Sequence, residues 1–209
     1  MKLAFVVQRY GAEVAGGAEA LCRQTAHALV AAGHEVVILT TTARDYLQWS
    51  PFYARGPAVD GRVELLRFDA DPAEPGVASR IGRELGLGWG DWEREVEWAR
   101  AQGPVSRPLL EHLAATVDEY DAVALWTYLY ATTQLAMPVA SDRAILVPTA
   151  HDEPMFRFRL TRGLMLRQRV CGLALYRRQR LRRPPPSPLI PRGWLSGTRG
   201  RSSASQGFA

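Results

Sequence analysis

The first 40 residues constrain the fold of this chain more than any other segment. Residues 3–7 form a short apolar run with β-branched members, and residues 34–40 form a second apolar run. Between them a glycine-containing loop leads into residues 18–32, where apolar side chains recur at helical spacing until Gly33 caps the segment. A strand, a glycine turn, a helix and a strand make a βαβ unit, which predicts an α/β protein with a parallel sheet.

The glycine pair Gly16-Gly17 stands where the predicted helix opens. Backbone N–H groups point outward there, and a backbone without side chains lets a phosphate come close. The pattern is neither of the two familiar phosphate motifs. Gly11, Gly16 and Gly17 do not spell G-x-G-x-x-G, and Gly17-Ala18 occupy the places of Lys and Ser/Thr in a P-loop. Two interpretations therefore stand side by side: an anion site, or close packing of the helix on the sheet.

Charge divides the chain into two unlike parts. Of its 26 basic residues, 13 lie in residues 1–153 together with all 21 acidic residues, which gives that part a net charge of −8. Residues 154–209 hold the other 13, all arginine, and no acid, so they carry +13. The sequence therefore predicts an acidic domain followed by an arginine-rich tail, and the overall charge of +5 describes neither.

Cysteine usage and hydropathy point to the cytoplasm. Cys22 and Cys171 are too few for a disulfide scaffold, so we expect buried or idle thiols in a reducing compartment. No cluster has the spacing of metal ligands, so no metal is expected. The chain contains no apolar run long enough to span a membrane and no signal-peptide layout.

Further strands and helices alternate along the rest of the acidic part. The predicted strands cover residues 61–68, 122–126 and 144–147, and the predicted helices cover residues 91–102, a segment that begins after Ser106, and residues 127–137. Residues 45–57 and 69–76 are predicted loops. This alternation indicates a doubly wound parallel sheet.

Ligands of such sheets bind beyond the carboxyl ends of the strands, and three polar segments follow strands here. They are residues 8–17, 127–130 and 151–153. His151 is the best titratable candidate, since it follows a buried strand and could orient a hydroxyl. The candidates for binding a polar substrate are Arg9, Tyr10, Glu19, Tyr128, Asp152 and Glu153. The alternatives are structural: Glu19, Asp152 and Glu153 could favour a helix dipole, and Tyr128 could line the core.

Taken in order, these segments resemble a known family. They are Val7-Gln8-Arg9-Tyr10-Gly11, Glu13-Val14, Gly16-Gly17-Ala18-Glu19, Thr127-Tyr128-Leu129-Tyr130 and Pro148-Thr149-Ala150-His151-Asp152-Glu153-Pro154. Together they are similar to the N-terminal domain of bacterial glycosyltransferases of family four, which have the GT-B fold. The resemblance covers residues 1–158.

The resemblance implies two Rossmann-like domains with the active site between them. The N-terminal domain mainly binds a glycan or lipid-linked acceptor, and the C-terminal domain binds the nucleotide-sugar donor. Transfer usually retains the anomeric configuration and needs no metal or other cofactor. By position, Gly16 and Gly17 match the glycine loop that approaches the donor diphosphate, and His151 matches a histidine near the transferred sugar. The expected location is the cytoplasm, including the inner face of the membrane.

The chain departs from the family pattern after Phe158. The donor-binding domain is missing, and residues 159–209 are basic and of low complexity, with a proline run at 184–188. Lys2 is the only lysine, and the tail is built from residues of GC-rich codons, so we expect it to be disordered or an out-of-frame translation. The chain would then be an acceptor-side half, inactive alone.

Two other functions are weighed against a transferase. One is a binding module whose basic tail engages nucleic acid or an anionic membrane, with salt-dependent affinity. The tail lacks helix-turn-helix and zinc patterns, so nucleic acid is not an expected partner. The other is an NAD-dependent oxidoreductase. The missing fingerprint and the Thr40-Thr41-Thr42 end of the second strand, which carries no acid, both disfavour it.

Overall fold

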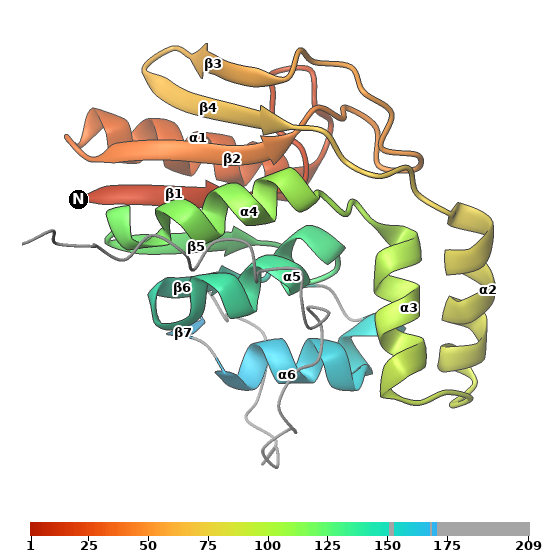
Figure 1. Ribbon diagram of the computed structural model, residues 1–209. Helices are drawn as coiled ribbons and strands as arrows, with labels where there is room; N and C mark the ends of the chain where they lie inside the picture. Colours follow the sequence, from red (N-terminus) through yellow and green to blue (C-terminus); the bar gives the residue numbers. More distant parts are fainter. Residues whose placement is uncertain (151–152, 168, 171–209) are drawn as a thin grey trace, which may run out of the picture.

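The computed structural model describes residues 1–150, 153–167 and 169–170 (Figure 1). The strands are β1 (Lys2–Val6), β2 (Glu35–Thr41), β3 (Gly56–Asp60), β4 (Val63–Phe68), β5 (Ala122–Trp126), β6 (Ala144–Val147) and β7 (Arg169–Val170). The helices are α1 (Gly17–Ala31), α2 (Pro75–Gly86), α3 (Trp92–Gln102), α4 (Arg107–Thr116), α5 (Ala131–Ala140) and α6 (Arg159–Arg167), with short 3-10 turns η1 (Val117–Glu119), η2 (Ser141–Arg143) and η3 (Pro154–Arg157). His151, Asp152, Cys171 and the tail from residue 171 lie outside the described residues.

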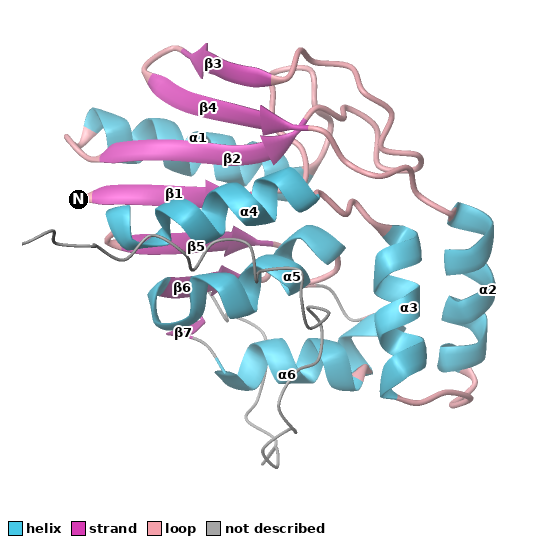
Figure 2. Ribbon diagram, viewed as in Figure 1, coloured by secondary structure: helices cyan, strands magenta, loops and turns pink. Residues whose placement is uncertain are grey.

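The described strands form one sheet in the order β3-β4-β2-β1-β5-β6-β7. All neighbouring strands are parallel except β3, which pairs antiparallel with β4 at one edge. Helix α1 covers one face, and α4 and α5 cover the other, while α2 and α3 extend beyond the carboxyl ends of the strands (Figure 2). The predicted α/β class with a mostly parallel sheet is confirmed.

Two apolar clusters fill the space on either side of the sheet, as expected for strands covered on both faces. One lies under α1, where Cys22, Ala26 and Val30 pack with residues of the central strands such as Phe5 and Ile38. The larger cluster packs α3, α4, α5 and α6 against the other face; among its completely buried members are Leu109, Leu113, Leu125 and Leu146.

Several boundaries agree with the sequence prediction, and others differ for local reasons. β5 and β6 begin and end where predicted, and Ser106 caps α4 by accepting from the N–H of Leu109 (3.4 Å). Helix α5 begins later than predicted because Thr127 adopts a left-handed φ of 64°, which no helix continues. Neither β3 nor α2 was predicted: each begins inside a predicted loop, and the rest of each was assigned to no element.

Helix α6 lies beyond the expected domain boundary at Phe158 and packs as part of the domain. Leu160 and Leu164 are buried in the larger core cluster. The buried carboxylate of Glu95 on α3 accepts from the N–H groups of Arg159 (3.1 Å) and Leu160 (2.8 Å). It thereby satisfies two of the donors that every helix start leaves free. The packed domain therefore continues through at least Leu164.

The carboxylate of Asp60 joins the edge strand β3 to α1. It accepts from Nε of Arg23 (2.6 Å) and from the hydroxyl of Tyr10 (3.2 Å), and it pairs with Nε2 of His27 (2.8 Å). The Arg23 guanidinium, which donates to both oxygens, holds the pKa of Asp60 well below its usual range, and His27 adds to this effect. This cluster fixes the position of an otherwise exposed hairpin.

Candidate functional site

The strand order places a topological switch point beside β1. From β1 the chain proceeds to β2 on one side, whereas β5 lies on the other side. Loops that leave two such strands separate at their carboxyl ends, and ligands of open α/β sheets bind at this switch point. Two of the polar segments predicted to bind a ligand, residues 8–17 and 127–130, follow these two strands. The topology therefore brings them to the same place.

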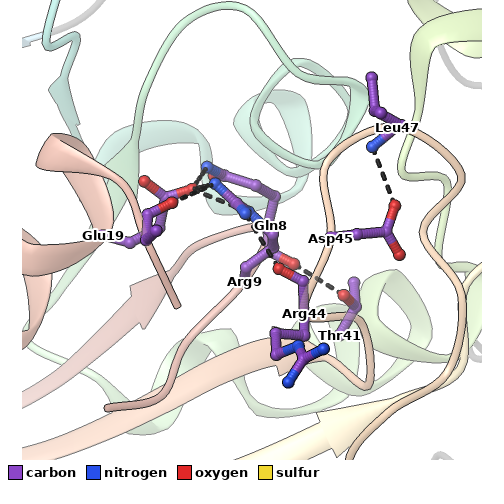
Figure 3. Close-up of polar contacts among 8 residues, drawn as sticks. Gln8, Arg9, Glu19, Thr41, Arg44, Asp45 and Leu47 are labelled. Carbon is purple, nitrogen blue, oxygen red and sulfur yellow. Dashed lines mark hydrogen bonds and ion pairs between the residues drawn. The ribbon is translucent and has the colours of Figure 1, made fainter. Parts of the chain in front are cut away.

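A buried ion pair organises the loop after β1. Nε and Nη2 of Arg9 donate to Oε1 of Glu19 (3.0 and 2.5 Å), and Nε2 of Gln8 donates to the same oxygen (2.8 Å), as Figure 3 shows. Both charged side chains are only 6% exposed. Removing either partner would leave a buried charge alone, so this contact ties the loop firmly to the first turn of α1.

Arg9 has its donors engaged on several sides. Nη1 donates to the carbonyl of Arg44 (2.9 Å) and Nη2 to the carbonyl of Ala15 (3.3 Å), while the ring of Tyr46 lies 5.4 Å from the guanidinium carbon. Thr41 donates to the carbonyl of Gln8 (2.7 Å), which joins the ends of β1 and β2 (Figure 3). Arg9 and Glu19, both expected to bind substrate, therefore position the glycine turn.

The two glycines of this turn have different surroundings. A Cβ on Gly16 would lie 2.1 Å from Oε2 of Glu19 and 3.2 Å from Nη2 of Arg9, so the ion pair requires glycine there. A Cβ on Gly17 would meet no atom within 4 Å. Gly16 is the N-cap of α1 and supplies no side-chain cap to the helix. The helix N-terminus is therefore open at Gly17, as an approaching anion would require.

Tyr128 and Glu153 form a second polar contact, from the loops after β5 and β6. The buried Tyr128 donates its hydroxyl to Oε1 of Glu153. Burial and the neighbouring carboxylate raise the pKa of Tyr128, so the hydroxyl stays a donor at neutral pH. The structure thus brings two predicted site residues together. His151 and Asp152, the other candidates of this segment, lie outside the described residues.

Unpaired buried polar groups and unusual backbone angles mark the same edge. Gln8 Oε1 and Thr127 Oγ1 are buried and find no hydrogen-bond partner among the described residues. Thr127 and Thr149, which follow β5 and β6, both have left-handed φ angles, 64° and 45°. Such conformations cluster at functional sites. Gln8 and Thr127 were not singled out in the sequence, although each is a polar residue close behind an apolar strand.

Tyr10 lies apart from these groups. Its side chain is completely buried in the cluster under α1, and its hydroxyl donates to Asp60. Burial raises the pKa of Tyr10 above its usual range, with the Asp60 carboxylate adding to this effect. Tyr10 therefore presents no exposed polar group for a substrate in this structure.

The fold and the site define an α/β protein with an open helix N-terminus at the switch point of its sheet. In comparisons with known proteins, no family model, no curated protein and no solved structure matches the chain. Within the described ranges, no group of three or more His, Cys, Asp or Glu side chains could hold a metal ion. None of the helices that the structure describes combines the length and apolarity needed to cross a membrane.

Proposed function

We propose that this chain is the acceptor-side domain of a nucleotide-sugar-dependent glycosyltransferase with GT-B architecture. The observation that carries the proposal is the open backbone at Gly17, held at the switch point by the Arg9–Glu19 pair. A helix N-terminus that is neither capped by a side chain nor covered suits one oxygen of a diphosphate. The resemblance of residues 1–158 to family-four glycosyltransferases supplies the reaction class.

In this proposal each polar group has a defined task. Gln8, Arg9 and Glu19 hold the turn in place, and the N–H groups at Gly17 and Ala18 face the donor diphosphate. Glu153 contacts acceptor hydroxyls beside the switch point, and the buried Tyr128 positions its carboxylate. His151 lies near the transferred sugar by its match to the family motif. The second domain of such an enzyme would hold the rest of the donor, so this chain alone binds it weakly and does not turn it over.

The binding part is tested by following backbone amides by NMR during titration with UDP, GDP and ADP. We expect the amides of Gly17 and Ala18 to shift with at least one of these nucleotides, because their N–H groups face the diphosphate. Gly17→Ala should weaken this binding about tenfold, because its methyl group fills the space that the phosphate enters. Gly76→Ala is the matched control, since Gly76 also lies in a first helical turn with open space at Cβ.

Two outcomes would contradict this proposal. Equal binding by wild type and Gly17→Ala would remove the anion site at Gly17, and the absence of any nucleotide-induced shift would do the same. A transfer assay tests the claim that this chain alone does not turn over a nucleotide sugar. Turnover of a nucleotide sugar by the chain alone would show that it is not merely the acceptor-side half.

A further inference from the structure

A cleft of about 520 Å³ opens where the α2–α3 connection faces η3 and α6. Its size lies within the range of small-molecule sites, roughly 300–1,000 Å³. Three arginines line it: Arg157 from η3, and Arg159 and Arg162 from α6. Arg159 and Arg162 are three residues apart and therefore lie on the same face of their helix. Three positive charges thus gather around one concave surface.

These charges outnumber the two carboxylates that line the same cleft, Glu95 and Glu153. None of the three exposed guanidinium groups forms an ion pair with a carboxylate that the structure describes. By contrast, the neighbouring arginines Arg80 on α2 and Arg94 on α3 both form ion pairs with Glu84. The residues that line the cleft therefore carry a net positive charge.

Both carboxylates in the cleft already accept hydrogen bonds from the protein. Both oxygens of Glu95 accept from backbone N–H groups at the start of α6, and burial raises its pKa. Oε1 of Glu153 accepts from Tyr128. Gly86 and Gly88 also line the cleft, and a Cβ on either would meet no atom within 4 Å. The cleft thus offers a net positive charge together with bare glycine backbone.

We propose that this cleft binds a phosphorylated small molecule through a phosphate or diphosphate group held by Arg157, Arg159 and Arg162. Guanidinium groups suit phosphate oxygens because they donate in a planar fork and keep their charge at any physiological pH. Glu153 lines the cleft and also accepts from Tyr128, so the cleft borders the loops that follow β5 and β6. The inference concerns binding alone and does not depend on the proposed transferase function.

The test is calorimetric titration of the full-length chain with inorganic pyrophosphate. We expect the double variant Arg159→Gln/Arg162→Gln to weaken binding at least about tenfold, since each charge-assisted contact it removes is strong. The control variant Arg55→Gln/Arg62→Gln removes the same charge from arginines that do not line the cleft and should bind like wild type. Arg157→Gln, which leaves α6 unchanged, should weaken binding as well. Circular dichroism confirms that each variant is folded.

Other outcomes would overturn the proposal. If wild type binds no pyrophosphate, the site does not exist. If both double variants weaken binding equally, the affinity comes from overall charge, to which the tail also contributes. A second arm uses vesicles of phosphatidylcholine with and without phosphatidic acid. Sedimentation with the acidic vesicles that is lost in Arg159→Gln/Arg162→Gln, without pyrophosphate binding, would assign the cleft to a lipid headgroup instead of a small molecule.

Discussion

Gly16 and Gly17 are adjacent, yet only Gly16 is required by its neighbours within the fold. A methyl group on Gly16 would overlap the Glu19 carboxylate, whereas a methyl group on Gly17 would enter open space. The Glu19 carboxylate cannot simply turn away, because Arg9 and Gln8 donate to it in a buried site. One glycine therefore serves stability, and the other is free to serve a ligand.

Gly16→Ala should therefore destabilise the protein by about 1–3 kcal/mol, because the methyl group displaces a carboxylate from a buried ion pair. Gly17→Ala should change the free energy of unfolding by less than about 0.5 kcal/mol. Urea unfolding followed by far-UV circular dichroism measures both. In a Glu19→Ala background, Gly16→Ala should lower the free energy of unfolding much less than it does in wild type, since the carboxylate with which its methyl group clashes is gone. A full, additive penalty in that double variant would contradict the steric explanation.

The same residues show what the sequence can reveal of a site. The order of strand, glycines and helix predicts Arg9, Glu19 and the glycines at the carboxyl end of β1, and the strand order puts the switch point of the sheet there. The sequence does not reveal that Arg9 and Glu19 bond to one another, because that pairing depends on how the loop after β1 folds back over α1. Residue types identified the loop after β1 as a candidate site. Only tertiary contacts distinguish Arg9 and Glu19, which hold the loop in position, from Gly17, whose backbone is open to a ligand.

At the scale of elements, the sequence predicted the bounds of the buried strands most accurately. β5 and β6 are short apolar runs and were predicted to the residue. Helix α2 was missed because Pro75 and Gly76 were taken as loop residues, although proline is favoured in the first turn of a helix. Strand β3 was missed because an exposed edge strand has no apolar alternation to detect. The two misses differ in weight, because α2 places Ile81 completely buried in the main core, whereas β3 has no buried residue.

The Asp60 cluster makes the edge hairpin sensitive to acid. Because Arg23 lowers the pKa of Asp60 in the folded state, the unfolded state binds a proton more readily. The contribution of Asp60 to stability is thus complete above its unfolded pKa, about 3.9, and is lost as the pH falls toward the lower folded pKa. Asp60→Asn should destabilise the protein by about 1–2 kcal/mol at pH 7 and reduce its further loss of stability below pH 4.

Urea unfolding of wild type and variant between pH 7 and pH 2.5 measures this effect. Asp69→Asn is the matched control, because Asp69 also pairs with an arginine, Arg55, but at an exposed site (54% exposed). Such pairs contribute little, about 0–1 kcal/mol. If Asp60→Asn shows the same acid dependence as wild type, the Asp60 cluster does not link the hairpin's stability to protonation.

For the whole molecule, the question is how far the cooperative unit extends along the chain. The sequence predicted a boundary after Phe158, where the family resemblance ends and shortly after the last acidic residue, Glu153. Charge is a surface property, however, and apolar burial decides which residues belong to the core. The ring of Phe158 packs edge-on against Trp98 (5.2 Å), and Leu160 and Leu164 continue that contact from α6. We therefore expect α6 to unfold together with the sheet.

Leu160→Ala tests this expectation in the full-length chain. Leu160 is 2% exposed, so its truncation leaves a cavity in the main core and should lower the free energy of unfolding by about 2–4 kcal/mol. Leu166→Ala makes the same chemical change on the same helix where the side chain is 39% exposed, and should cost less than about 1 kcal/mol. Tryptophan fluorescence and far-UV circular dichroism should report one coincident transition for both variants. If Leu160→Ala leaves that transition unchanged, α6 is not part of the cooperative unit, and the domain ends near Phe158 as the sequence predicted.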